Sequence, residues 1–173
     1  MSYFLTSTYY FDGSDAAASD SNAVWTDETN LDDGNTATFA STNTNGSTSS
    51  NYVIVEGTNA SLLENIIKEV KARIYGYFSG GSGEVDATIY TDALGESLGA
   101  CNATGVSPGA YGSYVTLSTP SGGWTWEKIQ ALETKIYKVG TATTVFASLV
   151  EVYVTYEPIN LSSKSFYLKQ GFQ

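Results

Sequence analysis

The sequence predicts an all-β protein: a single antiparallel β-sandwich of jelly-roll type with one short helix and extended termini. Two patterns carry this prediction. Residues 67–78 alternate small or apolar side chains with polar and aromatic ones, and residues 150–156 repeat the same period of two. Segments rich in Gly, Ser, Asn and Pro separate the apolar runs, as in hairpin-connected strands. At 173 residues the chain can bury the core of one domain.

The first 22 residues are predicted as an N-terminal strand or arm followed by a loop. Residues 2–11 carry large apolar groups on both faces, so a strand here needs cover on both sides. A strand within the sandwich would have this cover, and so would an arm packed on another subunit. Asp12 to Asn22 is a loop by composition. The sandwich domain is placed at residues 23–157.

The remaining strands are expected at residues 52–55, 67–78, 85–90, 97–102, 114–118, 133–139 and 144–156. Thr125 can cap a short helix that runs to Leu132, and we expect this segment to close one end of the sandwich. Residues 158–173 form a polar tail that carries several apolar side chains. We expect this tail to pack on the domain or to serve as an intersubunit arm.

Composition excludes several classes of function. The formal net charge of −10 argues against nucleic acid and against anionic membranes, because both need clustered Lys and Arg. Histidine, the commonest general base, is absent, and Cys101 is the only cysteine, so no intrachain disulfide can form. We therefore predict a protein that is not an enzyme. No transmembrane span is expected, and residues 2–5 lack the basic and apolar regions of a signal peptide, so either the chain is not secreted or its signal has been removed. Its Lys-poor, Ser- and Thr-rich profile is typical of secreted or virion β-proteins.

The acidic residues suggest two kinds of chemistry, and neither is favoured. Glu127, Glu133 and Glu151 could supply the paired carboxylates of a glycosidase, but acids that face outward from strands are usually only solvated. A turn rich in oxygen ligands could hold calcium, although its spacing is not that of an EF-hand. A solvated loop is the favoured interpretation, and no other cofactor is predicted. The candidate calcium ligands are Asp27, Asp32, Asp33 and Asn35.

Aromatic side chains are the strongest candidates for a contact surface. Tyrosines on the outward faces of the predicted strands would form an apolar face outside the core, which usually marks a binding surface. Such a face suits subunit contacts at least as well as glycans. Trp25, Trp124 and Trp126 could stack on sugars, but we expect them to pack in the core or at its ends. The predicted contact residues are Tyr3, Tyr9, Tyr75, Tyr77, Tyr90, Tyr153, Phe166, Tyr167 and Phe172.

The order of short patterns resembles that of jelly-roll virion structural proteins of tailed phages. The matching residues are Trp25, Leu31, Asp33-Gly34, Ala37-Thr38, Ile66 to Phe78, Trp124 to Leu132 and Val152 to Tyr156. The resemblance covers about residues 24–157 and implies a capsid-decoration, head-fibre or tail-associated subunit. The same layout occurs in secreted carbohydrate-binding and adhesion modules.

Two functional hypotheses follow. The first is a non-enzymatic structural protein of a virion or an extracellular filament. It would assemble with copies of itself, or decorate a capsid, tail or filament lattice, through sheet edges and tyrosine-rich contacts. The alternative is a secreted carbohydrate-binding or adhesion module with a calcium-stabilised loop. The expected location is therefore the virion or the extracellular space.

Overall fold

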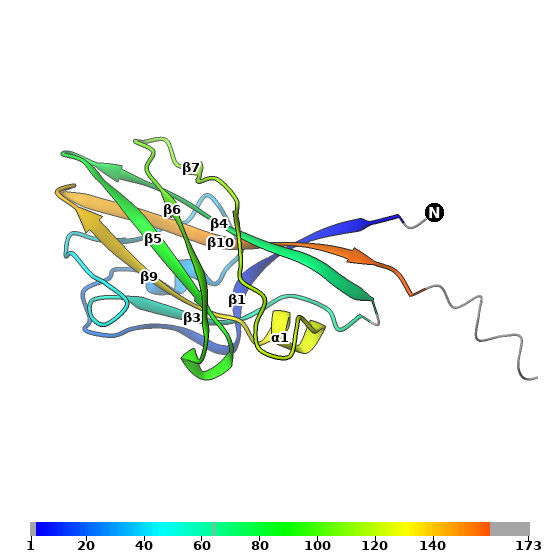
Figure 1. Ribbon diagram of the computed structural model, residues 1–173. Coiled ribbons are helices and arrows are strands. Elements are labelled where there is room, and N and C mark those ends of the chain that lie inside the picture. Colours follow the sequence, from blue (N-terminus) through cyan, green and yellow to red (C-terminus); the bar gives the residue numbers. More distant parts are fainter. Residues whose placement is uncertain (1–2, 64, 160–173) are drawn as a thin grey trace, which may run out of the picture.

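Two antiparallel sheets pack face to face in the computed structural model, which describes residues 3–63 and 65–159 (Figure 1). The strands are β1 (Leu5–Asp20), β2 (Ala40–Thr42), β3 (Val53–Thr58), β4 (Ile66–Ser79), β5 (Gly83–Tyr90), β6 (Ser97–Ala103), β7 (Ala110–Tyr111), β8 (Val115–Thr116), β9 (Glu133–Gly140) and β10 (Thr144–Glu157). One α-helix, α1 (Trp126–Gln130), and two 3₁₀ turns, η1 (Glu28–Leu31) and η2 (Asp92–Leu94), complete the described chain. The predicted all-β sandwich with one short helix is confirmed.

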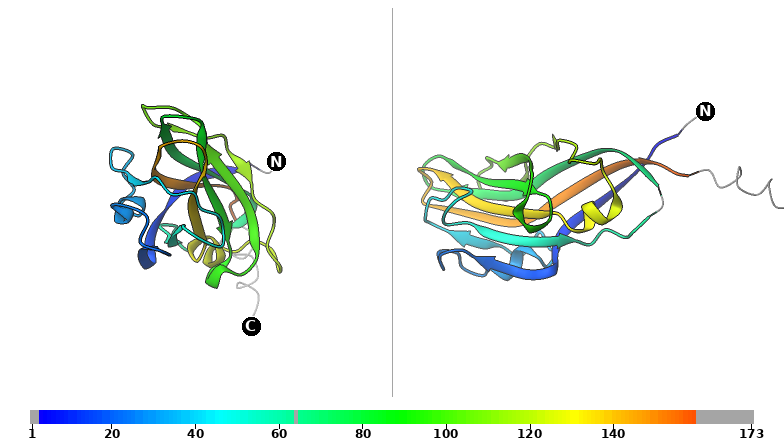
Figure 2. Two further views of the ribbon diagram at one scale, coloured as in Figure 1. Left: turned by 90° about the vertical axis from the view of Figure 1, so that its left-hand side faces the viewer. Right: turned by 60° about the horizontal axis from the view of Figure 1, so that its bottom comes forward.

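Strand β1 belongs to both sheets. Its first half pairs with β10, where Leu5 lies opposite Tyr156, and its second half pairs with β3, where Asp20 lies opposite Val53. One sheet has the order β6-β5-β9-β3-β1, and the other continues as β1-β10-β4 with β7 and β8 on its outer edge. Because one strand serves both sheets, the sandwich is nearly closed along this side, as the end-on view in Figure 2 shows.

The prediction of a loop at Asp12–Asn22 is wrong, because β1 continues to Asp20. The pairing of β1 with β3 shifts register between Phe11 and Ala16 and again between Ala16 and Ser19. Such bulges accept residues that are uncommon in regular strands, which explains the loop-like composition. β1 is therefore a member of the sandwich rather than an arm outside it.

The core lies between the two sheets and follows the predicted alternation. On β4, Val70, Ala72 and Ile74 are fully buried, while the residues between them face outward. On β10, Val152 and Val154 point into the same core. Full burial of each Val or Ile side chain stabilises the fold by about 1.5–3 kcal/mol. The opposite sheet contributes Val53, Val55, Val85, Ala87, Ile89 and Ile136.

Helix α1 closes one end of the sandwich, as predicted. The Thr125 hydroxyl caps the helix by accepting the backbone N–H of Lys128 at 3.3 Å. Trp126 is 3% exposed, its ring centre lies 5.3 Å from that of Tyr156, and its Nε1 donates to the carbonyl of Asn65 at 3.0 Å. This tryptophan is an end cap rather than a free binding platform. Within the described residues, no helix is long and apolar enough to cross a bilayer.

Candidate functional site

Aromatic side chains form a continuous strip on the outward face of β4 and β10. At one end the Phe146 and Tyr77 rings stack, with centres 4.5 Å apart and planes 10° from parallel. Phe39 meets Tyr77 edge-on at 5.2 Å and lies 6.1 Å from Tyr75. Every ring is half-buried, so part of each stays open to solvent. The aromatic strip consists of Phe39, Tyr75, Tyr77, Tyr111, Tyr114, Phe146 and Tyr153.

Alternation along the two long strands places the first members of the strip. Tyr75 and Tyr77 flank Gly76, whose inward side has no room for a side chain: a Cβ there would lie 2.6 Å from the carbonyl oxygen of Phe146. Tyr77 lies directly opposite Phe146 across the β4–β10 pair. The strand register alone therefore brings these rings together.

Residues 104–118, which we call the edge segment, bring further rings from a distant part of the chain. This segment runs antiparallel to β4 through β7 and β8, and the Gly112 N–H donates to the carbonyl of Ile74 at 2.9 Å. A Cβ on Gly112 would lie 1.8 Å from the carbonyl oxygen of Asn102, so only glycine fits between the two sheets here. The expected strand at residues 114–118 is shorter, but it places Tyr111 and Tyr114 over the outward face of β4.

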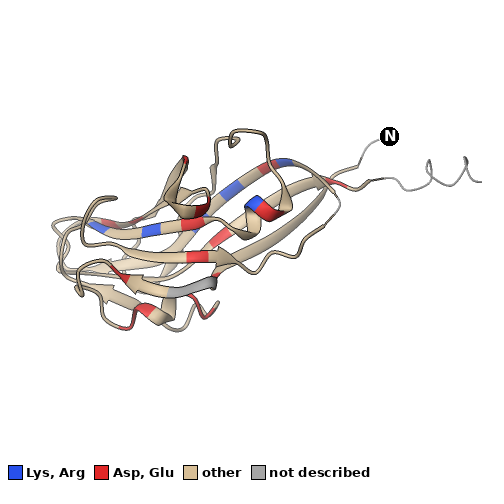
Figure 3. Cartoon of the chain, turned by 90° about the horizontal axis from the view of Figure 1, so that it is seen from below, with Lys and Arg blue, Asp and Glu red and all other residues tan. Residues whose placement is uncertain are grey.

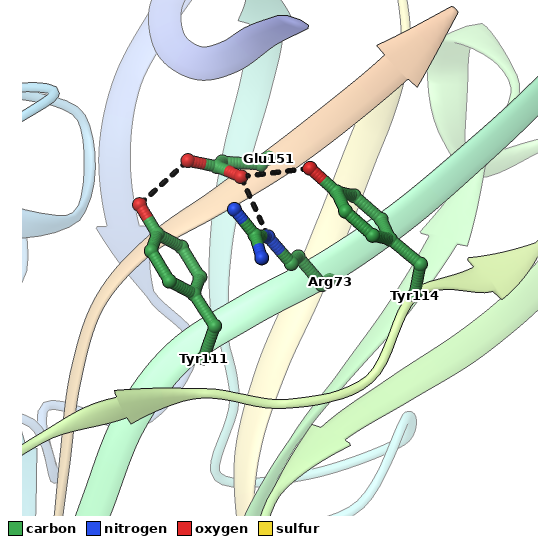
Figure 4. A network of polar contacts seen from close by, with 4 residues as sticks. All are labelled: Arg73, Tyr111, Tyr114 and Glu151. Atoms are coloured by element: carbon green, nitrogen blue, oxygen red, sulfur yellow. Dashed lines mark hydrogen bonds and ion pairs between the residues drawn. The ribbon is translucent and has the colours of Figure 1, made fainter.

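Arg73 occupies the middle of the strip. Its guanidinium carbon lies 3.7 Å from the ring centre of Tyr111 and 4.3 Å from that of Tyr114. Its Nε donates to Glu151 Oε2 at 2.7 Å, and Glu151 also accepts the hydroxyls of Tyr111 at 2.5 Å and Tyr114 at 3.2 Å (Figure 4). A cation over an aromatic face contributes about 0.5–2 kcal/mol. The network fixes the edge segment on the sheet and orients both tyrosines.

The tyrosine hydroxyls of this network stay protonated. Burial raises the pKa of Tyr111 well above its usual range, and the hydrogen bond and negative charge of Glu151 raise it further. Burial and the charge of Glu151 raise the pKa of Tyr114 in the same direction. Both groups are therefore hydrogen-bond donors at physiological pH. Within the described chain Arg73 donates a hydrogen bond only through Nε, which leaves its two terminal nitrogens for a ligand.

The arrangement is suited to binding. Half-exposed aromatic rings offer flat apolar faces, and Arg73 with the tyrosine hydroxyls supplies polar groups between them. Tyr and Arg are the residue types that most often dominate binding surfaces. The strip fits a ligand with both apolar faces and hydrogen-bonding oxygens.

Three of the predicted contact tyrosines, Tyr75, Tyr77 and Tyr153, lie in the strip. Tyr90 does not belong to the same row, because it lies on β5 in the other sheet, where Lys135 Nζ is 5.7 Å from its ring centre. Tyr9 packs edge-on against Trp126 at 6.0 Å instead of forming a free surface.

Of the other predicted contacts, Tyr3 is 64% exposed just before the start of β1. Phe166, Tyr167 and Phe172 lie outside the described residues. Sequence reasoning missed Phe146, because the period of two that buries Val150 and Val152 would place it inward, whereas the register shift between Ala147 and Leu149 turns it outward. It also missed Phe39, Tyr111 and Tyr114, which reach the strip only through tertiary packing.

The candidate calcium ligands hold their own loop in place. Asp32 Oδ2 accepts the N–H of Ala18 at 3.0 Å, and Asp33 Oδ1 accepts that of Asn35 at 2.8 Å. The side-chain oxygen of Asn35 accepts a backbone N–H two residues on, and Asp27 is exposed. Within the described chain, no group of three His, Cys, Asp or Glu side chains could hold a metal ion. The oxygens of Asp33 and Asn35 form local turns of the kind that Asp and Asn usually make, and Asp32 ties the loop to β1.

The carboxylates considered for a glycosidase are spread over the molecule. Glu151 lies on the outward face of β10, and Glu127 is exposed on α1. Glu133 is 5% exposed and accepts the N–H groups of Ala93 and Leu94 at 2.6 and 2.7 Å, so it supports the η2 turn. The three carboxylates therefore come from three separate elements and have separate surroundings.

Comparison with known proteins finds similarity among solved structures. No family model and no curated protein match the sequence. The C-terminal CBM6, a carbohydrate-binding module, of LamC, a marine laminarinase from Zobellia galactanivorans, matches with a TM-score of 0.43 and 9% identity. The match covers 87% of this chain and 98% of that chain.

This finding corrects the first functional hypothesis. A self-assembling or lattice-decorating structural protein is contradicted, because the structural neighbour is a carbohydrate-binding module, the class named in the alternative. The virion and lattice partners expected with the first hypothesis have no support. The resemblance to tailed-phage virion proteins stays a prediction.

Proposed function

We propose that this chain is a non-catalytic module that binds carbohydrate through the aromatic strip. The observation that carries the proposal is the position of Arg73 between two half-exposed tyrosine rings, in the middle of a continuous row of aromatic side chains. A sugar ring has an apolar C–H face that can stack on an aromatic ring, and hydroxyl groups that can accept from the Arg73 guanidinium and donate to tyrosine oxygens. The strip combines both features on one face.

Two further observations support binding without catalysis. The chain contains no histidine, and burial raises the pKa of the Cys101 thiol to about 12, so this buried cysteine is a poor nucleophile. The carboxylates that could act as an acid–base pair lie on separate elements. The Ser- and Thr-rich, Lys-poor composition supports an extracellular setting. Calcium is not part of the proposal.

The test measures the retardation of the full chain in gels that contain single soluble polysaccharides, followed by calorimetry with oligosaccharides of those that bind. We expect Tyr153→Ala, at one end of the strip, to weaken binding at least tenfold, which corresponds to about 1.4 kcal/mol. Tyr90→Ala removes a half-buried tyrosine from the other sheet and should bind like the parent. The proposal fails if no polysaccharide retards the protein, or if the two variants weaken binding equally.

A further inference from the structure

Charged groups beside the aromatic strip are paired with one another on the same face. All of them belong to β4 and β10, and each cation next to the strip has a carboxylate partner within ion-pair distance. The face is therefore close to electrically neutral. The ion pairs recorded in the described chain are Lys68–Glu157 (3.0 Å), Lys71–Glu69 (2.9 Å) and Arg73–Glu151 (2.7 Å).

The remaining Lys side chains of the described chain lie on other elements. They are on α1 and β9, as Figure 3 shows for the charged residues. Lys128 and Lys135 donate to backbone carbonyls, and Lys138 Nζ donates to the side-chain oxygen of Asn45 at 2.5 Å. No described cation near the strip therefore lacks an acidic partner. The net charge of −10 adds a general repulsion of polyanions.

The strip is elongated along the strand direction. Tyr77 and Phe146 form one end, and Tyr153, opposite Lys71, forms the other. At the usual rise of a strand, the distance along β4 from Lys71 to Tyr77 is about 20 Å. The ring contacts from Phe146 to Tyr111 connect one end to the centre, and Arg73 connects the centre to Tyr114. A surface of this shape fits a chain of sugars rather than a single sugar.

We propose that the ligand of the strip is an extended, uncharged polysaccharide chain that lies along β4 and β10, and that acidic glycans are rejected. This inference rests on the proposed function, because it describes the ligand of the same site. Sugar rings stack at the two aromatic ends, and the terminal nitrogens of Arg73 donate to sugar oxygens in the middle. An added carboxylate or sulfate would lie near Glu151, and the positive charge of Arg73 beside it is already balanced by that carboxylate.

The first experiment compares ligands on the unmodified chain by calorimetry at low and high salt. The probes are a neutral hexasaccharide from each polysaccharide that retards the protein, the matching disaccharide, and oligogalacturonate of equal length. We expect the neutral hexasaccharide to bind at least tenfold more tightly than both others, with little effect of salt. Oligogalacturonate or the disaccharide binding as tightly as the hexasaccharide would overturn the inference. If no glycan of any kind binds, the proposed function itself fails, which is a different result.

A second experiment changes the charge balance of the face. Glu151→Gln leaves Arg73 without its carboxylate and should give measurable binding of oligogalacturonate at low salt, which high salt abolishes. Glu69→Gln frees Lys71 at the end of the strip without touching a tyrosine, and it should produce a smaller gain of the same sign. The thermal unfolding midpoint of each variant shows whether it is folded. If both variants are folded and still reject oligogalacturonate as the parent does, the paired charges are not the cause of the rejection.

Discussion

Arg73 places its guanidinium carbon 3.7 Å from the centre of the Tyr111 ring, although the two residues come from separate strands of the sheet edge. The contact joins the edge segment to β4 and sets the middle of the aromatic strip. Glu151 on β10 accepts hydrogen bonds from both the Arg73 and the Tyr111 side chain and so holds the pair together. Because three separate segments meet at this point, the strip exists only in the folded chain.

Removing the stacked ring at the far end of the strip should weaken binding and leave the fold intact. Tyr77→Ala takes away the ring that stacks on Phe146 and meets Phe39. We expect the affinity for a neutral hexasaccharide to fall about tenfold, measured by calorimetry. Tyr52→Ala is the matched control, because Tyr52 is also half-buried but packs under Lys135 on the other sheet. Equal losses in the two variants would place the ligand elsewhere.

A methyl group on Gly112 should displace the edge segment. Its Cβ would lie 1.8 Å from the carbonyl oxygen of Asn102, a backbone atom that cannot move aside. Gly112→Ala should lower the free energy of unfolding by about 1–3 kcal/mol and weaken glycan binding as Tyr111 and Tyr114 shift. Gly105→Ala lies in the same segment, where the nearest atom would be 3.8 Å away, and should be tolerated. Urea unfolding of both variants checks the difference, and similar values for the two would disprove the steric argument.

Asp86 should make stability depend on pH. Burial, reinforced by the charge of Glu84, raises the pKa of Asp86 to about 6, and its Oδ1 is buried with no hydrogen-bond partner in the described chain. A carboxyl whose pKa is higher in the folded chain than in the unfolded chain favours folding at low pH. Its contribution is fully present at pH values below its pKa in the unfolded chain, about 3.9. That contribution is lost as the pH rises through about 6.

Asp86→Asn should therefore be more stable than the parent at pH 8, by about 1 kcal/mol once solvent screening of this half-exposed group is allowed for. At pH 4 the advantage should largely disappear, because Asp86 is then mostly protonated in the folded protein. Urea unfolding of both proteins at the two pH values measures this. An equal difference at pH 4 and pH 8 would show that the carboxylate charge is not the cause.

Glu133 should matter for stability and not for binding. Its carboxylate accepts the N–H groups of Ala93 and Leu94, which have φ angles of 55° and 49°. Glutamine has one acceptor oxygen, so Glu133→Gln leaves one of these N–H groups facing an amide donor. The substitution should therefore lower the free energy of unfolding by about 1–3 kcal/mol. Glu96→Gln, at an exposed acid that accepts the Ser121 N–H, should lower the free energy of unfolding by less. Calorimetry should show unchanged glycan affinity for both, since neither touches the strip.

Much of the fold could be predicted because it depends on local patterns. The period of two along β4, and along β10 after its bulge, assigns side chains to the core or to the outward face, and the structure follows it at Val70, Ile74 and Val152. Thr125 caps α1 as expected, because a cap needs only residues within one turn. Strand β1 was missed beyond Phe11, since bulges permit a loop-like composition in a paired strand.

The sequence by itself determined the sandwich class, the main strands and the outward position of Tyr75, Tyr77 and Tyr153, because each follows from side-chain alternation within one strand. Only the tertiary structure decided that the edge segment lies on β4, that Tyr90 belongs to the other sheet, and that Arg73 is enclosed by two tyrosine rings. The reason is physical. Alternation along a strand determines which face of the sheet a side chain occupies. The register between strands that are distant in sequence determines which side chains meet on that face.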